Sequence, residues 1–284
     1  MKNGFKTAVL LAGMAGLLML AASFMGQGAV VIAFFISLAM IGGSYWFSDK
    51  LAIRSARAVE VTEAQLPQYY AVMRGLTTEA GMPMPKLYVS PEPQPNAFAT
   101  GRNPKNAAVA VTEGLLKSLS WDEIRGVLAH ELAHIKNRDI LIGSVAATIA
   151  STISFLANMA MWASMFAGGR DDEDSNPIAM IALAILAPIS ASLIQMAISR
   201  SREFQADRTA AQLMGDGEPL ARALEKLHAS SQRIPSHVTP AQASNYIINP
   251  LANRKVTMAK LFTTHPPAED RVARLRSGEW RDLF

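Results

Sequence analysis

The sequence predicts a mainly α-helical, multi-pass membrane protein with four transmembrane helices and a water-exposed unit that carries a small β-sheet. Three observations predict this fold class. First, 50% of the 284 residues are hydrophobic, more than an ordinary soluble protein of this size contains. Second, uncharged residues gather in blocks long enough to cross a bilayer. Third, the segments between these blocks combine charged helices with short β-strands.

The first uncharged block covers residues 7–48 and breaks at a Gly-Gln-Gly sequence, 26–28, into two stretches of about 20 residues each. It predicts a transmembrane hairpin formed by spans 1 and 2. A cleaved signal peptide is the alternative for the first span, because Lys2 and Lys6 precede it and small residues lie at 21–23. The apolar stretch is longer than that of a usual signal peptide, and a second span follows at once, so the hairpin is favoured.

Residues 140–199 hold the other two predicted spans, which an acidic outer loop at 168–176 separates. Lysines and arginines flank the hairpin and the inner ends of these spans. Since positive residues favour the cytoplasmic side, both termini and the charged segments 51–139 and 200–284 are expected in the cytoplasm. The absence of cysteine fits a reducing compartment. Membrane orientation accounts for the net charge of +4 without a nucleic-acid partner.

The two cytoplasmic segments are expected to meet and form the functional unit. Short strands are predicted between Pro- and Gly-rich turns, at Lys86–Ser90, Asn96–Thr100 and Ala107–Val111. Helices are predicted on either side of a Gly-rich break, at Arg202–Met214 and Pro219–Ser230. Residues 234–254 are rich in Pro, Ser and Asn and predict a long loop that substrate would order.

A capping box predicts a helix that begins after Ser120. In this pattern the Ser120 hydroxyl binds the backbone amide of Glu123, and the Glu123 carboxylate binds the backbone amide of Ser120. Leu119 and Ile124 can form the hydrophobic contact that accompanies such a start. Charged residues on both sides of the following HELAH sequence indicate that this helix lies outside the lipid.

The HELAH sequence at 130–134 predicts a zincin-like catalytic site. His130 and His134 are one helical turn apart, so both imidazoles project from one face and can bind one Zn²⁺. Glu131 lies at the edge of that face, where it can take a proton from the attacking water. A helix that carries two histidines by chance is the alternative, but the chain has only 5 His, which makes such a coincidence rare.

A catalytic zinc keeps three protein ligands, so a third donor is required. Glu203 follows the fourth predicted span by about one turn, just as HELAH precedes the third, and antiparallel spans would bring the two to one height. Asp207, one turn further on, can accept the free N–H of a ligand histidine. On spacing alone, a helix-face charge pair with a neighbouring arginine remains an equal alternative for Glu203. His228 and His237 are rival ligands that no motif surrounds.

Four stretches of the chain together resemble the HtpX family, bacterial membrane-bound zinc metalloproteases related to the CAAX prenyl endoproteases. They are NAFATG at 96–101, HELAHIKNRD at 130–139, SREFQAD at 201–207 and THPP with its following arginine at 264–271. The resemblance covers nearly the whole chain.

The resemblance implies that His130, His134 and Glu203 bind zinc and that Glu131 is the general base. It also implies residence in the bacterial inner membrane and a role in the quality control of membrane proteins under stress. Asp139 closes the second matching stretch and is expected, like Asp207, beside a ligand histidine.

The same resemblance suggests roles for two further groups of residues. A His in a Pro-rich turn and an Arg one helical turn later can stabilise an oxyanion, which predicts catalytic roles for His265 and Arg271. The alternative is that His265 caps the final helix. By family analogy, Asn96, Ala97 and Phe98 would line the cleft and pair with the extended substrate backbone.

We therefore expect a zinc endopeptidase that cleaves misfolded or damaged membrane proteins on the cytoplasmic side of the bilayer. An intramembrane or CAAX-type protease is one alternative, although an intramembrane enzyme would place HELAH inside a span. A non-catalytic membrane chaperone with structural zinc is the other. An intact Glu131 argues against it, because a structural site needs no base.

Overall fold

The computed structural model describes residues 49–139, 200–238, 246–250 and 266–281, together with Ala243 and a few single residues between 31 and 47. Within these residues no helix is both long and apolar enough to cross a membrane. The predicted hairpin at 7–48 lies almost wholly outside the described residues, and the predicted spans at 140–199 lie wholly outside them.

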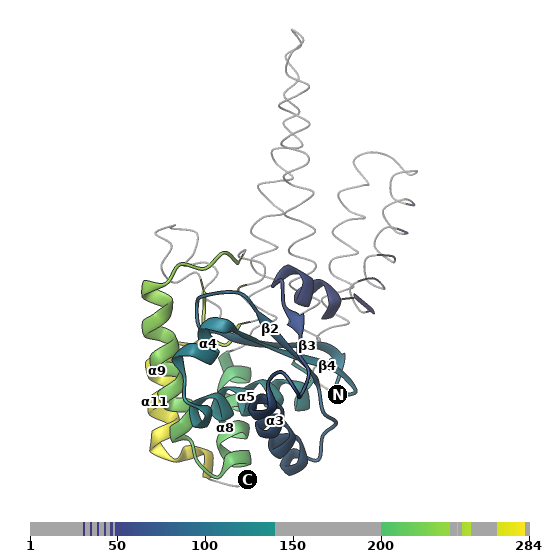
Figure 1. Cartoon of the computed structure of the whole chain (residues 1–284). Coiled ribbons are helices and arrows are strands. Elements are labelled where there is room, and N and C mark those ends of the chain that lie inside the picture. The colour runs from purple at the N-terminus through teal and green to yellow at the C-terminus, as the bar shows by residue number, and fades with distance from the viewer. Residues whose placement is uncertain are drawn as a thin grey trace.

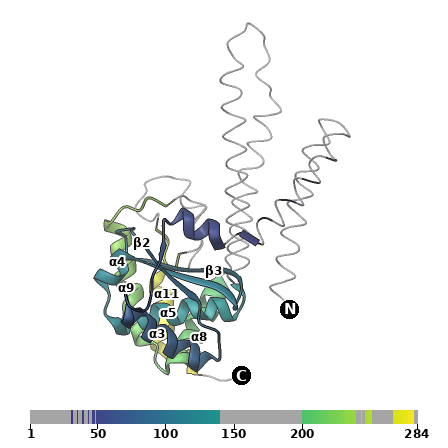
Figure 2. The same cartoon turned by 45° about the vertical axis from the view of Figure 1, so that its right-hand side comes forward.

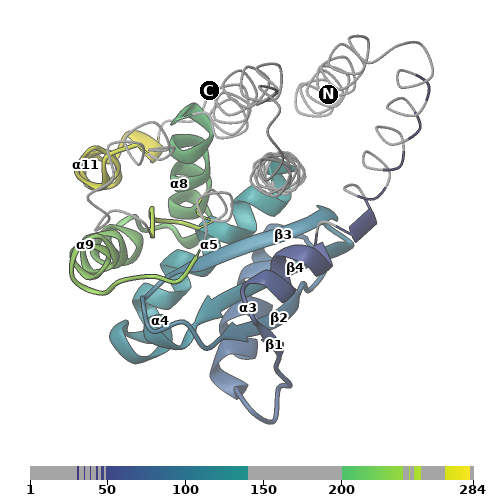
Figure 3. The ribbon, with the colours of Figure 1, turned by 90° about the horizontal axis from the view of Figure 1, so that it is seen from above.

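A four-stranded sheet forms one layer of the described fold (Figure 1). Its strands are β1 (Val59–Glu60), β2 (Lys86–Ser90), β3 (Ala97–Asn103) and β4 (Asn106–Thr112). The order in the sheet is β1-β2-β4-β3, with β2 and β4 parallel and the other two pairs antiparallel. β3 is therefore an edge strand, and in the view from above it is the strand that lies over α5 (Figure 3).

The hairpin between β3 and β4 depends on Gly101. This residue has a φ of +133°, which L side chains rarely adopt, and a Cβ atom there would lie 2.2 Å from the Asn106 carbonyl oxygen. The register between the strands also shifts between Gly101 and Asn103. The glycine thus permits the close backbone approach and the irregular end of the hairpin.

The helices form the second layer and pack mainly beneath the sheet (Figure 2). They are α3 (Pro67–Ala80), α4 (Glu113–Ser118), α5 (Trp121–Lys136), α8 (Arg200–Met214), α9 (Glu218–Arg233) and α11 (Ala268–Ser277), followed by the short 3-10 helix η2 (Glu279–Arg281). α5 lies at the centre, where it contacts β3 and β4 on one side and α3, α8 and α9 on the others. α9 and α11 run side by side.

The central helix begins with the predicted capping box. The Ser120 backbone N–H donates to Glu123 Oε2 at 2.8 Å, and the Glu123 backbone N–H donates to Ser120 Oγ at 3.3 Å. Leu119 and Ile124 are both buried in the main core. Further along α5, Gly126 allows α9 to approach closely, because a Cβ atom there would lie 2.6 Å from the Leu220 backbone nitrogen.

The structure confirms the three predicted strands, and β2 has the predicted bounds. β3 begins one residue later and ends three residues later than predicted, and β4 is one residue longer than predicted at each end. The two predicted helices of the second segment correspond to α8 and α9. β1, α3 and α4 were not predicted. Of the predicted loop at 234–254, the structure describes 234–238, Ala243 and 246–250.

Candidate metal centre

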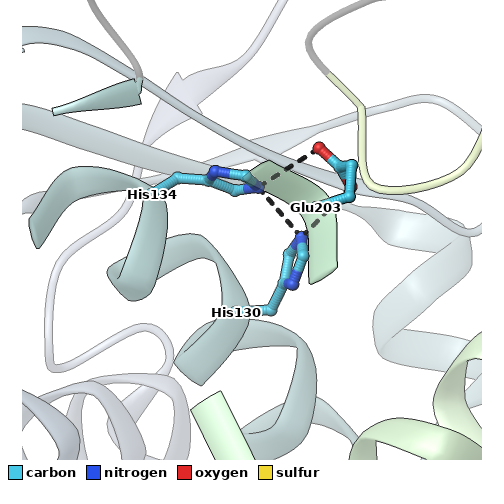
Figure 4. Close-up of side chains that lie close together, drawn as sticks. All are labelled: His130, His134 and Glu203. Atoms are coloured by element: carbon cyan, nitrogen blue, oxygen red, sulfur yellow. Dashed lines mark hydrogen bonds and ion pairs between the residues drawn. The ribbon is translucent and has the colours of Figure 1, made fainter. Parts of the chain in front are cut away.

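α5 and α8 bring two histidines and a glutamate to one point (Figure 4). One helical turn separates His130 from His134 on α5, and their Nε2 atoms lie 3.1 Å apart. Glu203 reaches them from α8, with Oε1 3.5 Å from His134 Nε2 and Oε2 3.8 Å from His130 Nε2. His130 and Glu203 are buried, whereas His134 retains 14% side-chain exposure.

The chemistry and spacing of these donors fit one zinc ion. Four ligands held at about 2.1 Å in a tetrahedron lie about 3.4 Å from one another, close to the three separations observed. Two imidazole nitrogens and one carboxylate oxygen also form a donor set typical of catalytic zinc, which keeps its fourth position for water or substrate. Among the described residues, His130, His134 and Glu203 are the group that meets the distance requirement for a metal ion.

Glu131 is buried beside this group and is placed as a proton acceptor. Its carboxylate accepts a hydrogen bond from the backbone N–H of Ala99 in β3, which links it to the edge strand. Burial raises its pKa to about 7, and the nearby Glu203 carboxylate adds to this effect, while His134 opposes it. A carboxylate with a pKa near neutrality can take up a proton and release it again.

Each ligand histidine has a carboxylate at its other ring nitrogen. Asp207 Oδ1 lies 2.9 Å from His130 Nδ1, and Asp139 Oδ2 lies 3.2 Å from His134 Nδ1. When Nδ1–H donates to a carboxylate, the Nε2 lone pair is left for the metal and the orientation of the ring is fixed. The structure therefore puts both predicted carboxylates next to the ligand histidines.

The two rings differ in electrostatic surroundings. Burial lowers the pKa of His130 to about 4, with the neighbouring His134 and Arg271 acting in the same direction. Burial also opposes the charging of His134, but the hydrogen bond to Asp139 and the Glu203 carboxylate raise its pKa to about 9. A metal ion bound by both Nε2 atoms would compete with the proton that His134 binds in the metal-free protein.

Arg271, from α11, is fully buried and holds Asp207. Its Nε donates to Asp207 Oδ2 at 2.8 Å, and its Nη2 donates to Asp207 Oδ1 at 2.7 Å. Burial raises the pKa of Asp207, but the guanidinium outweighs this effect and lowers the pKa to about 2. Sequence reasoning predicted an oxyanion role for Arg271 and missed this contact. The sequence held a signal for this contact: a buried arginine needs a carboxylate partner, and Asp207 stands in another of the stretches that resemble the family.

The other predicted residues that the structure describes do not belong to the metal-binding group. Asn96 is buried and its side chain binds Ile248, while Phe98 is buried in a second cluster with Ala110, Val238 and Tyr246. The side chain of His228 is 40% exposed and that of His237 is 80% exposed, and neither belongs to the metal-binding group. His265 lies outside the described residues.

Comparison with known proteins agrees with this site. The family model of Peptidase family M48 matches residues 63–279. A "Protease HtpX homolog" of Syntrophobacter fumaroxidans is 52% identical over 283 residues, which is 98% of this chain and 100% of that protein. A "Protease HtpX homolog" of Burkholderia mallei is 51% identical over 281 residues, 97% of this chain and 96% of that protein.

A solved structure shares the fold. The crystal structure of S. mikatae Ste24p matches with a TM-score of 0.51 at 20% sequence identity and covers 96% of this chain. This chain spans 65% of the length of that structure. The family match over most of the sequence and the nearly full-length relatives establish that the chain belongs to peptidase family M48.

Proposed function

We propose that this chain is a membrane-bound zinc endopeptidase that cleaves misfolded or damaged membrane proteins on the cytoplasmic side of the bilayer. The observation that carries this proposal is the group formed by His130, His134 and Glu203, three donors at zinc-binding separations with Glu131 buried beside them. Membership of a peptidase family supports peptide hydrolysis as the reaction. The resemblance to the HtpX family supports membrane proteins as the substrates.

The reaction needs a base near the metal and a route for its proton. When bound, zinc acts as a Lewis acid that lowers the pKa of water toward neutrality and polarises the scissile carbonyl. Glu131 takes a proton from the attacking water as the new carbon–oxygen bond forms. It returns that proton to the leaving amine nitrogen as the carbon–nitrogen bond breaks.

Two positioning contacts support the ligand geometry. Asp207 and Asp139 hold the ring nitrogens that face away from the metal. Arg271 forms an ion pair with Asp207 and keeps it ionised, and its Nη1 also lies 3.5 Å from Oε2 of the ligand Glu203. The proposed oxyanion-stabilising residues of the C-terminal motif are His265 and Arg271, and both roles stay predictions.

The proposed membrane arrangement follows the charge pattern of the sequence. We place a transmembrane hairpin at 7–48 and two further spans, with an acidic outer loop, at 140–199. The catalytic part 51–139 would carry HELAH, and the part 200–284 would carry the third ligand. Both termini and the metal centre would lie in the cytoplasm. Reporter fusions test this arrangement: a fusion at Asp172 should report the outside and one at Phe284 the inside.

Three alternative activities make different predictions. An intramembrane protease would hold its HELAH helix in lipid, but α5 begins with exposed or partly exposed charged residues, Asp122 and Arg125. A CAAX-type protease would require a prenylated substrate. A non-catalytic chaperone would need the metal for folding alone, and nothing in a structural site would require Glu131.

Metal analysis combined with a protease assay tests the proposal. The full chain, purified in detergent, should contain about one zinc per chain. It should cleave an unfolded membrane protein, lose that activity with a chelator and regain it when zinc is added. A protein that holds zinc but cleaves no peptide bond, with the base intact, would support the chaperone alternative and contradict the proposal.

A further inference from the structure

The outer edge of β3 runs past the metal centre. The Asn96 carbonyl accepts a hydrogen bond from the Thr112 backbone N–H, so the backbone groups of Asn96 face β4. Because these groups alternate along a strand, those of Ala97, Ala99 and Gly101 face the outer edge. The Ala99 N–H donates to Glu131, which places this edge beside the reacting centre. An extended peptide can add to such an edge as a further strand.

One end of this edge is already occupied by the chain itself. The segment Tyr246–Pro250, named the stop segment here, lies against β3 at its N-terminal end. The Ile247 backbone N–H donates to the Ala97 carbonyl at 3.0 Å, which is the bond a substrate strand would make there. Asn96 holds the next residue from both sides: its Nδ2 donates to the Ile248 carbonyl at 2.9 Å, and its Oδ1 accepts from the Ile248 N–H at 3.4 Å.

The stop segment is part of the core. Ile247 and Ile248 are 2% and 5% exposed. Arg271 Nη1 donates to the Ile247 carbonyl at 2.9 Å, so the guanidinium that holds Asp207 also holds this segment. The Tyr246 ring packs edge to face on Phe98, with 5.1 Å between centroids. A segment fixed by side-chain bonds, an ion-paired arginine and an aromatic contact is expected to stay in place when a peptide binds.

The other end of β3 has different surroundings. Arg102 stacks on the Trp46 ring, with its guanidinium carbon 4.5 Å from the ring centroid. Trp46 is 56% exposed and Phe47 is 53% exposed, although both are large aromatic side chains. Exposed aromatics next to arginine are typical of the membrane–water interface. The hairpin end of β3 thus faces the side from which an extended segment of a membrane protein would arrive.

We propose that the stop segment ends the substrate-pairing edge of β3 at Ala97, so that substrates pair with β3 only from the Ala99 carbonyl toward Asn103. This inference rests on the proposed function and adds a rule of substrate recognition to it. Backbone pairing then contributes on one side of the scissile bond only. A suitable substrate needs an extended segment on that side and can be short on the other.

A length series tests the rule. The full chain in detergent is given peptides with one cleavage sequence, extended residue by residue on either side of the scissile bond. A backbone hydrogen bond of about 0.5–1.5 kcal/mol predicts that kcat/KM rises about 2- to 12-fold for each added pairing residue on one side. Extension on the other side should change kcat/KM less than about 2-fold, because no new backbone hydrogen bond forms there. Equal gains on both sides would overturn the inference.

Hydrogen exchange gives a readout that does not depend on cleavage. The Glu131→Gln protein is mixed with the longest peptide, and exchange is followed in the fragment that holds residues 246–250. The Ile247 amide should stay protected in the complex, while amides of β3 near Gly101 gain protection. Faster exchange at 246–250 on binding would show that substrate displaces the stop segment, and this result would overturn the inference.

A variant extends the test to the residue that fixes the segment. Asn96→Ala removes both side-chain bonds to Ile248, so exchange at 246–250 should rise and length dependence should appear on both sides. Gln68→Ala, the loss of an exposed amide side chain on α3, should change neither. If no peptide of any length is cleaved, the proposed function fails. If peptides are cleaved but the length dependence of Asn96→Ala equals that of the unchanged protein, only the present inference fails.

Discussion

The Nδ1 atom of His130 lies 2.9 Å from Oδ1 of Asp207, in a pair that is almost completely buried. The same Asp207 oxygen accepts from Arg271 Nη2 at 2.7 Å. A carboxylate that binds a ligand histidine and an arginine at once fixes the ring and keeps its own charge. The helices α5, α8 and α11 thus meet at one carboxylate directly behind the metal centre.

Asp207→Asn should weaken zinc binding while the three ligands remain. Loss of such a partner typically costs about 10- to 100-fold in metal affinity or activity, so added zinc should restore part of the activity. The variant should also lose stability, by up to about 3–5 kcal/mol, because the buried Arg271 would lose the carboxylate that two of its nitrogens contact and keep only the longer contact with Glu203. Competition with a zinc chelator and thermal unfolding measure the two effects. The exposed Asp270→Asn variant should match the unchanged protein in both, and an unaltered zinc affinity in Asp207→Asn would contradict this account.

Glu203→Ala should lower both zinc content and activity. With two imidazoles alone, the ion would be held more weakly and would bind an additional water. His228→Ala and His237→Ala should leave the zinc content unchanged, because both side chains lie outside the donor group. Metal content per chain after purification decides between these ligands. Full zinc in Glu203→Ala, together with loss in either histidine variant, would show that the third ligand is misassigned.

Much of the metal centre could be predicted from the sequence because its signals are local. The spacing of His130 and His134 and the capping box at Ser120 each depend on residues within one or two helical turns. Glu203 was reached only by assuming that two distant segments dock, and the resemblance favoured it. The strands were predicted from the Pro- and Gly-rich turns between them, but the hydrogen-bond register was needed to show where β3 ends.

The rest could not be predicted because it depends on long-range packing. Arg271 and Asp207 are 64 residues apart in the sequence, and nothing local shows that the guanidinium contacts this carboxylate. The Asn96 contact with Ile248 joins residues that are 152 positions apart, so it could not be predicted from the local sequence. α3 was missed because no capping side chain marks its start: the residue before it is Leu66, which makes no side-chain cap hydrogen bond.

Gly126→Ala should destabilise the protein, whereas Gly75→Ala should not. A Cβ atom at Gly126 would overlap the Leu220 backbone at 2.6 Å, and overpacking against backbone costs about 1–3 kcal/mol. At Gly75, in α3, nothing lies within 4 Å, so alanine should stabilise the helix by up to about 1 kcal/mol. Thermal unfolding in detergent measures both. Equal melting temperatures for the two variants would contradict the close approach of α5 and α9.

Glu123→Gln should destabilise the protein in a pH-dependent manner. Burial raises the pKa of Glu123, but hydrogen bonds from Lys226 and Ser120, each 2.8 Å long, outweigh it and hold the pKa below 4.5. A carboxylate whose pKa is lower in the folded state stabilises the folded protein at pH values above its unfolded-state pKa. This contribution is lost as the pH falls through the folded-state pKa.

At pH 7 and without metal, the Glu123→Gln variant should therefore be less stable than the unchanged protein by about 1 kcal/mol and unfold at a lower temperature. The difference should shrink as the pH falls below about 4.5, the unfolded value, because both proteins then carry a neutral side chain. Metal-free samples are used because protons displace zinc from its ligands at low pH, and that loss would itself change the stability. A difference that is the same at all pH values would contradict an ionised Glu123 in the capping box.

The most direct test of the central claim is Glu131→Gln. This change keeps His130, His134 and Glu203 and removes only the group proposed to move the proton. The purified variant should bind the same amount of zinc as the unchanged protein and lose peptide cleavage by at least about 100-fold, the lower range for a general base. Zinc content and turnover are measured on one preparation. Zinc binding without cleavage is the expected result, and undiminished turnover by this variant would contradict the assignment of Glu131 as the base.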